Sequence, residues 1–364
     1  MPRRVCLISL LPLAATGGGE RYSLGAAASV AAAGDECFVF SPEALCPPQA
    51  PLPRRLAARF VEVTPTPPHR RIRALDFRAV LDRIAVADIV LLHQFLTADL
   101  AFDVIANSGG SQILLFTTLG NEPLRALFQE LYQPSPSHFF VEISRFAAER
   151  SRVFSPRAMA VSGGIWREDL RLAPPAAQSA DRVCAVGRVL PHKGFEVTID
   201  ALPPGTRLSI VGPHDPASPY VEFLRGRAVG KPVEFLGRID DPDRERILSS
   251  CRILVASSST TLYTGEVLEQ AELLGLVIFE ALAQCCLPIA SALPPFVEAM
   301  RNLGLGDWVY PQRDIAKLGE LLRAAQALGS SEFLRIIDDA RAELPRHYEW
   351  DTYWTRVTAA CVSF

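Results

Sequence analysis

The chain has 364 residues, of which 49% are hydrophobic and 21% charged, and its formal net charge is −3. This composition excludes a disordered chain, and the slightly acidic balance argues against a nucleic acid as partner. The length exceeds what a single hydrophobic core usually serves, so we expect two domains.

The first predicted element is a buried strand over 5–10. Arg3 and Arg4 before this apolar run suggest a signal peptide, but the run is short and no small-residue cleavage site follows it. We therefore expect a strand that leads directly into the glycine-rich turn behind it. No segment reaches the roughly 18 apolar residues that span a bilayer, so we expect membrane contact to be peripheral at most.

Short apolar runs alternate with helical stretches along both halves of the chain. Because the strands show no apolar/polar alternation, helices should cover both faces of each sheet, which indicates parallel α/β sheets. The further strands expected are 36–40, 89–92, 112–116 and 139–142 in the first half, and 183–186, 207–211, 233–236, 253–256 and 287–290 in the second. The helices expected between them are 22–33, 124–131, 195–201, 242–251 and 276–284.

Two proline-rich stretches separate these elements. Between Ser41 and Arg70 we expect an irregular surface loop, with a recognition segment as the alternative. For the proline- and arginine-rich region 41–73, contact with an anionic lipid surface is the alternative to a solvated loop. The second stretch reads RLAPPAAQS over 171–179 and lies where one α/β half ends and the next begins. The predicted organisation is a first Rossmann-like domain at 1–170, a linker at 171–180, a second Rossmann-like domain at 181–345, and an aromatic helix at 346–364 that packs back on the first domain.

Eight cysteines are scattered along the chain without a C-x-x-C pair or a histidine-rich spacing. This pattern is typical of reduced thiols in a cytosolic protein, not of a disulfide framework or a zinc site. We therefore expect a cytoplasmic protein without a structural metal. The adjacent Cys285 and Cys286 are interpreted as packed core residues, with a redox-active pair as the alternative.

Three glycines, Gly17, Gly18 and Gly19, follow the first strand and precede an alanine-rich helix. A glycine loop at this place lets the backbone approach a phosphate closely and points N–H groups at it. The loop is not the dinucleotide fingerprint, because Tyr22 stands where G-x-G-x-x-G needs its last glycine, and it is not a P-loop. The missing fingerprint argues against an oxidoreductase. A tight turn without a ligand is the alternative.

Two cations follow the first strand of the second half, in the motif VGRVLPHKG. Arg188 and Lys193 lie in a loop bounded by glycines, at the carboxyl end of a predicted parallel strand. Such a pair suits a diphosphate and the charge that develops on it as it leaves, whereas ordinary surface cations are the alternative. Further turns at the same predicted edge, with Gly212 in one and Arg238 in the other, place backbone groups where they can hold a flat base.

The stretch ELLGLVIFE places Glu272 and Glu280 around an apolar run and a glycine. A buried carboxylate is rare unless it is paired or binds a ligand. On one continuous helix the two would lie about 12 Å apart along the axis, too far to share a metal or a proton. They suit two ends of one ligand if Glu272 precedes the helix, whose first N–H groups at Gly275, Leu276 and Val277 would then face an anion. A core helix with two solvated carboxylates is the alternative.

In this order, GGGERY, VGRVLPHKG, IVG, FLGR and the E-x7-E pair resemble glycosyltransferase family 4. The resemblance spans nearly the whole chain and is strongest over 183–300. It implies the GT-B fold, in which two Rossmann-like domains face each other across a cleft and a C-terminal helix crosses back to the first domain. It also implies a retaining transferase that uses a nucleoside diphosphate sugar, with the donor on the second domain and the acceptor on the first.

The resemblance assigns roles to individual residues. Arg188 and Lys193 would bind the donor diphosphate, and together with Glu272, which would contact the hydroxyls of the sugar, they form the expected catalytic set. Glu280 would bind the ribose. The other donor-site residues implied are Gly18, Gly19, Gly212, Arg238, Gly275, Leu276 and Val277. No metal and no further cofactor are expected, since the two cations and the helix start replace a metal and no D-x-D cluster occurs.

Several positions depart from the family pattern. The family often places a histidine after the fourth strand of the first domain, facing the sugar, and the nearest residue here is Thr118. His93, which ends a predicted strand, is the other candidate on the acceptor side. Leu273 and Leu274 replace a small residue and a phenylalanine, and Cys285 stands where glycine is usual.

The expected donor is a UDP- or GDP-sugar, and the expected acceptor is a small molecule, a glycan or a lipid-linked group. Two other functions remain as alternatives. A non-catalytic nucleotide-sugar-binding protein would agree with the departures at Thr118 and Cys285. A nucleotide-sugar 2-epimerase shares the GT-B fold, but it would need further acid–base carboxylates and histidines that the sequence does not assemble.

Overall fold

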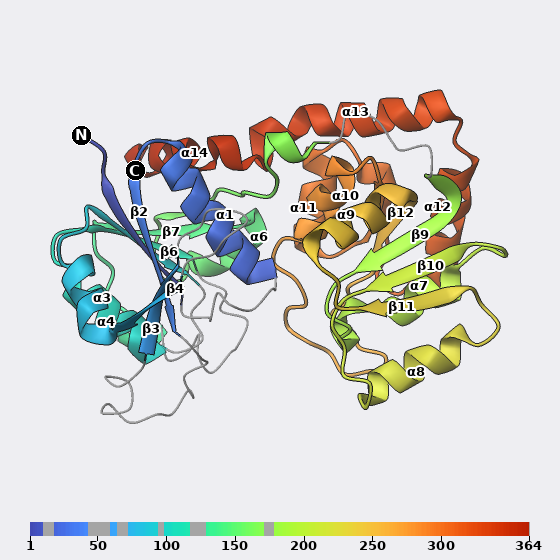
Figure 1. The fold of residues 1–364 in the computed structure, drawn as a ribbon, viewed down its shortest axis with the longest axis horizontal. Helices are drawn as coiled ribbons and strands as arrows, with labels where there is room; N and C mark the ends of the chain where they lie inside the picture. Colours follow the sequence, from blue (N-terminus) through green and yellow to red (C-terminus); the bar gives the residue numbers. More distant parts are fainter. Residues whose placement is uncertain are drawn as a thin grey trace. The chain divides into compact units, whose positions relative to one another are not determined.

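The chain divides into two compact units in the computed structural model. The first comprises Met1–Gly164 together with Glu349–Phe364, and the second comprises Ile165–Tyr348. Each unit is a sheet packed with helices (Figure 1). The residues that the structure describes are 1–9, 18–42, 59–63, 72–93, 98–116, 129–170 and 178–363.

The first unit is built on an eight-stranded sheet with the order β4-β3-β2-β1-β5-β6-β7-β8. Along the part β2-β1-β5-β6-β7-β8 of this order, neighbouring strands run parallel. By contrast, β3 pairs antiparallel with both β2 and β4. The strand order switches direction between β1 and β5, and such sheets bind ligands at the carboxyl edge of this switch point. The strands are β1 (Arg4–Ser9), β2 (Glu36–Pro42), β3 (Arg59–Val63), β4 (Ile72–Asp76), β5 (Ile89–His93), β6 (Gln112–Phe116), β7 (His138–Glu142) and β8 (Ala158–Ala160).

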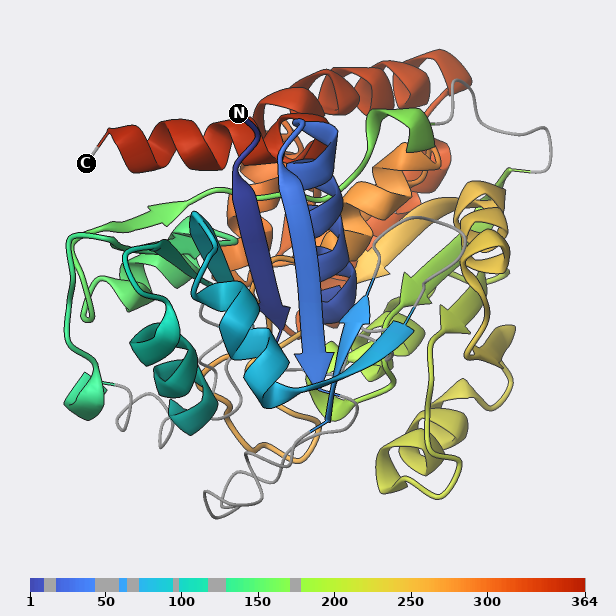
Figure 2. The ribbon, with the colours of Figure 1, turned by 60° about the vertical axis from the view of Figure 1, so that its left-hand side comes forward.

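The last helix, α14 (Trp350–Val362), belongs to the first unit and lies beside α1 (Gly18–Ala32), as Figures 1 and 2 show. The ring of Trp350 fills space that two glycines leave open, because a Cβ would lie 2.4 Å from it at Gly25 and 1.9 Å from it at Gly163. Ser29 Oγ donates to the Trp350 carbonyl oxygen at 2.7 Å and accepts from the Trp354 N–H at 3.0 Å. The other helices that the structure describes in this unit are α3 (Phe77–Ile84), α4 (Ala98–Asn107) and α6 (Arg145–Ser151).

The second unit is built on a six-stranded sheet with the order β11-β10-β9-β12-β13-β14. All its neighbouring strands run parallel, and the order switches direction between β9 and β12. This places a second switch point at the carboxyl ends of these two strands. The strands are β9 (Ser179–Val186), β10 (Arg207–Val211), β11 (Val233–Gly237), β12 (Cys251–Ala256), β13 (Leu287–Ser291) and β14 (Val309–Tyr310).

Helices cover both faces of this second sheet. On one face α7 packs against α8 and α12, and α10 packs against α9 and α13 on the other, as right-handed crossovers on the two sides of a switch point require. The α-helices are α7 (Phe195–Ala201), α8 (Pro219–Ala228), α9 (Asp241–Ser250), α10 (Leu276–Ala283), α11 (Pro294–Asn302), α12 (Ile315–Ala327) and α13 (Ser330–His347). The 3₁₀ turns are η1 (Arg167–Asp169), η2 (Pro191–Lys193) and η3 (Gly306–Trp308).

The structure confirms every predicted strand, with β9 starting four residues before the predicted 183. Three predictions need correction. The predicted irregular loop between Ser41 and Arg70 contains β3, so the first sheet is not wholly parallel. The glycine loop is shorter than predicted, because Gly18 and Gly19 already belong to the first turn of α1. The strands β4, β8 and β14, at sheet edges, were not predicted.

Other predictions fall wholly or mostly outside the described residues. These are the helix at 124–131, most of the linker at 171–180, and Thr118. Of the helices that the structure describes, none is both long and apolar enough to cross a membrane.

Candidate functional site

The candidate site lies in the second unit, at the carboxyl ends of β9 and β12. The loop after β9 runs through Arg188 and η2 to α7, and the loop after β12 runs over 257–275 to α10. Both loops therefore leave the sheet at the switch point, on the edge where parallel α/β sheets bind ligands. Seven of the eleven candidate donor residues lie on these two loops and on the first turns of α10, whereas Gly212 and Arg238 follow β10 and β11, and Gly18 and Gly19 lie in the first unit.

Glycines allow the loop after β9, which we call the β9 loop, to pack closely against neighbouring backbone. A Cβ on Gly212, which follows β10, would lie 1.8 Å from the carbonyl oxygen of Gly187. Gly194, with a φ of +61°, would place a Cβ 2.3 Å from the carbonyl oxygen of Ser257. No other residue fits these approaches, since any Cβ would overlap with a backbone atom. These glycines therefore fix the backbone on both sides of Lys193.

Lys193 and Glu272 form an ion pair between the two loops, Lys193 Nζ donating to Glu272 Oε1. Ser258 Oγ donates to the same carboxylate oxygen at 2.9 Å. Both charged side chains are mostly buried, with 22% of Lys193 and 15% of Glu272 exposed. Burial alone would raise the pKa of Glu272, but the charge of Lys193 and the hydrogen bonds from Lys193 and Ser258 hold it below its usual value. Glu272 is therefore a carboxylate at neutral pH.

His192 lies beside this pair and carries no charge at neutral pH. Burial, together with the positive charges of Lys193 and Arg188, lowers the pKa of His192 to about 4, although the charge of Glu272 acts in the opposite direction. Arg188 lies on the same loop and its side chain is exposed. The positive charge at the site thus comes from Arg188 and Lys193, not from the histidine.

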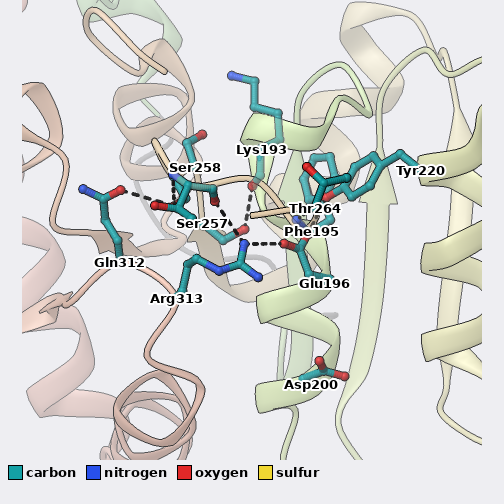
Figure 3. A network of polar contacts seen from close by, with 12 residues as sticks. Lys193, Phe195, Glu196, Asp200, Tyr220, Ser257, Ser258, Thr264, Gln312 and Arg313 are labelled. Atoms are coloured by element: carbon teal, nitrogen blue, oxygen red, sulfur yellow. Dashed lines mark hydrogen bonds and ion pairs between the residues drawn. The ribbon is translucent and has the colours of Figure 1, made fainter. Parts of the chain in front are cut away.

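Three consecutive serines after β12 hold the two loops together. Ser257 Oγ donates to the Lys193 carbonyl oxygen at 2.9 Å, and the Ser259 N–H donates to the His192 carbonyl oxygen at 2.8 Å. Ser258, between them, binds Glu272. All three serines are buried, each with 3% or less of its surface exposed. Figure 3 shows Ser257 and Ser258 beside Lys193.

The start of α10 follows Glu272 closely. Gly275 caps the helix with a φ of +87°, and a Cβ there would lie 2.5 Å from the ring of Phe296. The positive φ and the close ring both require glycine. The N–H groups of Leu276 and Val277 belong to the first turn, which has no intrahelical acceptors and carries the positive end of the helix dipole. This start is therefore suited to an anion.

Glu280 lies one turn further along α10 and faces α9. Arg244 on α9 lies 3.5 Å from Glu280 Oε1 and 3.2 Å from Asp241 Oδ1. Only 17% of the Glu280 side chain is exposed. The two glutamates of the pair thus have different partners, a lysine for Glu272 and an arginine for Glu280.

The described candidates of the first unit, His93, Gly18 and Gly19, lie at its own switch point or on α1. His93 ends β5 and is buried, with 1% exposed, and its Nδ1 lies 3.0 Å from Ser23 Oγ on α1. Burial lowers the pKa of His93 to about 3, so the ring is neutral at physiological pH. Gly18 and Gly19 open α1, ahead of Ser23 on the same helix.

The predicted donor residues fall into two groups. The structure brings Lys193 together with Glu272, and Gly212 against the β9 loop. Arg238 is exposed and directly follows the edge strand β11. The sequence interpretation missed the three serines, although three polar residues in a row at the end of an apolar strand are a signal for this edge.

Comparisons with known proteins agree with this arrangement. Residues 167–335, within the second unit, match the family model described as "Glycosyl transferases group 1". None of the curated proteins matches the sequence.

Solved structures resemble the chain over its whole length. A glycosyltransferase from Rickettsia africae has a TM-score of 0.73 at 13% identity and covers 99% of this chain and 98% of its own. AviGT4, a glycosyltransferase involved in avilamycin A biosynthesis, has a TM-score of 0.67 at 18% identity, with 99% and 97% covered. A UDP-forming trehalose-phosphate synthase from Burkholderia xenovorans has a TM-score of 0.65 at 13% identity, with 99% of each chain covered. The chain thus has the GT-B fold, and the family match supports a glycosyltransferase enzyme.

Proposed function

We propose that this protein is a retaining, metal-independent glycosyltransferase that moves a sugar from a nucleoside diphosphate sugar to an acceptor. The observation that carries the proposal is the Lys193–Glu272 ion pair, which lies within the segment that matches the family model. A cation and a carboxylate side by side at a switch point suit a ligand in which a phosphate adjoins a sugar.

The proposed donor lies along the two loops of the second unit. Lys193 and Arg188 bind the diphosphate, and the N–H groups of Leu276 and Val277 donate to its oxygens. Glu272 accepts hydrogen bonds from hydroxyls of the sugar, and the carboxylate of Glu280 accepts them from the ribose. The turns at Gly212 and Arg238 bind the base. A UDP- or GDP-sugar is the proposed donor, and one of the similar structures is a UDP-forming enzyme.

The proposed reaction exchanges one bond at the anomeric carbon for another on the same face of the sugar. The bond between this carbon and the diphosphate oxygen breaks, and the acceptor oxygen forms the new bond. The proton of the acceptor hydroxyl passes to the departing phosphate. Lys193, Arg188 and the start of α10 stabilise the negative charge on the diphosphate as it leaves. This preorganised positive charge takes the place of a divalent metal.

The first unit supplies the acceptor side of this proposal. His93 contributes there as a neutral imidazole, since its pKa is about 3. Gly18 and Gly19 are assigned to the diphosphate by the resemblance to the family, and Thr118 is the residue nearest in the sequence to the family's histidine. The acceptor is proposed to be a small molecule, a glycan or a lipid-linked group, with membrane contact at most peripheral. The cysteines that the structure describes are free thiols, which supports a cytoplasmic location.

A ligand panel tests the donor site. Thermal unfolding is measured with UDP-, GDP-, ADP- and dTDP-sugars and with the corresponding free diphosphates. At least one nucleotide sugar should raise the unfolding temperature, because a ligand that binds only the folded state stabilises it. If none does, the proposed function is wrong.

Turnover separates an enzyme from a binding protein. The nucleotide sugar that stabilises the protein is incubated with and without candidate acceptors, and release of the free diphosphate is followed. Acceptor-dependent release with the anomeric configuration retained, as read by NMR of the product, is the expected result. Binding without release in any mixture would point to a non-catalytic nucleotide-sugar-binding protein.

A further inference from the structure

A short segment of the second unit connects both charged partners of the donor site. Residues 257–261, which we call the strap, directly follow β12. Its serines bind the backbone at His192 and Lys193 on one side and the carboxylate of Glu272 on the other. A shift of the strap would therefore move Glu272 relative to Lys193.

Gln312 fastens the strap through its side-chain oxygen. Oε1 of Gln312 accepts hydrogen bonds from the Thr260 N–H at 2.9 Å, Thr260 Oγ1 at 3.1 Å and Ser259 Oγ at 3.2 Å. The amide of Gln312 donates to the Ala292 carbonyl oxygen at 3.4 Å. Three donors of the strap thus converge on one oxygen.

Arg313, the next residue, fastens the strap to α7. One nitrogen of its guanidinium donates to the Thr261 carbonyl oxygen at 3.1 Å and to Glu196 Oε1 at 2.8 Å. Glu196, in the first turn of α7, is 2% exposed, and its other oxygen accepts from Tyr220 Oη at 2.6 Å. The Tyr220 hydroxyl in turn accepts from the Phe195 N–H at 2.9 Å. Figure 3 shows Arg313 reaching toward Glu196, with Tyr220 behind it.

The backbone at Arg313, which makes these contacts, has a strained conformation. Its φ is +62°, in the left-handed region that disfavours residues with a Cβ. Among the described residues other than glycine, only Cys285 shares a positive φ. Such strain persists where the surrounding contacts compensate for it. The contacts at Arg313 are those with the strap and with Glu196, next to the loop that carries Lys193.

We propose that Gln312 and Arg313 are positioning residues of the donor site. They hold the strap so that Ser258 and Lys193 orient the Glu272 carboxylate toward the sugar of the donor. This inference rests on the proposed function, since it assigns a role within the same site. Neither residue belongs to the proposed set of donor contacts. Their loss therefore lowers the preference for a nucleotide sugar over its free diphosphate, which does not use Glu272.

The experiment measures, by calorimetry, the dissociation constants of the stabilising nucleotide sugar and of its free diphosphate. Gln312→Leu removes the shared acceptor and should weaken binding of the nucleotide sugar about tenfold, with a change of less than about twofold for the diphosphate. Gln312→Glu keeps an acceptor oxygen and should restore the wild-type ratio of the two constants. A purely structural role would alter the unfolding temperature without changing this ratio.

Variants at the Arg313–Glu196 ion pair separate the contact of Arg313 with Glu196 from its contact with Thr261. Glu196→Gln keeps Arg313 bound to Thr261 and should keep the ratio. The double variant Glu196→Gln/Arg313→Gln leaves no buried charge unpaired but releases Thr261, so it should lose the preference for the nucleotide sugar. Arg252→Gln is the matched control, because Arg252 likewise donates to a backbone carbonyl, that of Leu328 at 2.6 Å, at the opposite end of β12.

The two levels of the argument fail in different ways. A wild-type protein that binds no nucleotide sugar overturns the proposed function and this inference together. A wild-type protein that binds one, while Gln312→Leu and the double variant keep the wild-type ratio, overturns this inference alone. A ratio that changes equally in Arg252→Gln also overturns it.

Discussion

Lys193 and Glu272 form an ion pair although 79 positions separate them in the sequence. Each comes from a different loop, and both loops begin at the switch point of one sheet, at the carboxyl ends of β9 and β12. The ammonium group of Lys193 has three donor hydrogens, so it can keep its bond to Glu272 while it binds an anion. The negative charge of Glu272 would then lie beside that anion and oppose its binding.

Loss of the cation should affect the chemical step. We expect Lys193→Ala to lower kcat by about a hundred- to a thousandfold, equivalent to ~2.7–4 kcal/mol, because in the proposed reaction Lys193 stabilises charge that develops as the diphosphate leaves. The rate of diphosphate release at saturating donor measures this. Lys317→Ala is the control, since Lys317 forms an exposed pair with Glu320 at 3.0 Å. A kcat close to that of this control would show that Lys193 has no role in the chemistry.

The two glutamates should respond differently to neutral substitution. Glu272→Gln removes the negative charge beside Lys193, so the free diphosphate should bind as tightly as before or more tightly, while the nucleotide sugar binds about tenfold more weakly. Glu280→Gln should weaken both ligands, because the ribose is common to them. Calorimetric titration of each variant with both ligands distinguishes these patterns. Equal losses for both ligands in Glu272→Gln would contradict the assigned role of Glu272.

The stability contributed by Glu272 should depend on pH in a defined direction. Burial would raise its pKa, but Lys193 and Ser258 hold the pKa below the usual 4.5. A carboxyl with a depressed folded-state pKa stabilises the fold fully above its unfolded pKa, and this contribution is lost as the pH falls through the folded pKa. At neutral pH, the wild-type protein should thus unfold at a higher urea concentration than Glu272→Gln. The difference should shrink in acid, below the usual carboxyl pKa, and a constant difference would refute this.

Two glycines in the second unit should respond oppositely to alanine. Gly212→Ala places a Cβ 1.8 Å from the Gly187 carbonyl oxygen, so the β9 loop must shift. We expect a loss of stability of about 1–3 kcal/mol and weaker nucleotide binding. Gly226, inside α8, has open space around a Cβ, and Gly226→Ala should raise stability by about 0.5–1 kcal/mol without changing binding. Chemical unfolding and calorimetry measure both.

Removal of divalent metals should leave turnover unchanged. Arg188, Lys193 and the start of α10 supply positive charge where a metal would otherwise neutralise the diphosphate. After dialysis against EDTA, the rate of diphosphate release should equal that of untreated protein. A loss of activity that Mg²⁺ or Mn²⁺ restores would contradict a metal-independent reaction.

Most strands of both sheets were predictable because buried parallel strands are uninterrupted apolar runs. The same logic located the loop that carries Lys193, since the residues that follow such a run lie at the carboxyl edge. The strand β3 was missed, because it lies between proline-rich stretches and pairs antiparallel at the side of the sheet.

The partners of the candidate residues were not predictable from the sequence. Nothing local selects Lys193 as the partner of Glu272, or Arg244 as the partner of Glu280, because these choices depend on which loops and helices meet in space. Arg313 lies in a polar turn before α12 and reads as solvated. Its proposed positioning role follows from its ion pair with the buried carboxylate of Glu196, and this residue is 117 positions away in the sequence.

The packing of Trp350 has a consequence for how the protein is made. A ribosome delivers 165–348 before Trp350, so the second unit has its whole sequence while the first still lacks α14. Until then the space above Gly25 and Gly163, which the indole ring later fills, stays open on the nascent first unit. The first unit therefore begins to be synthesised before the second but is completed after it. The second unit, which carries the strap, can fold before the first unit is complete.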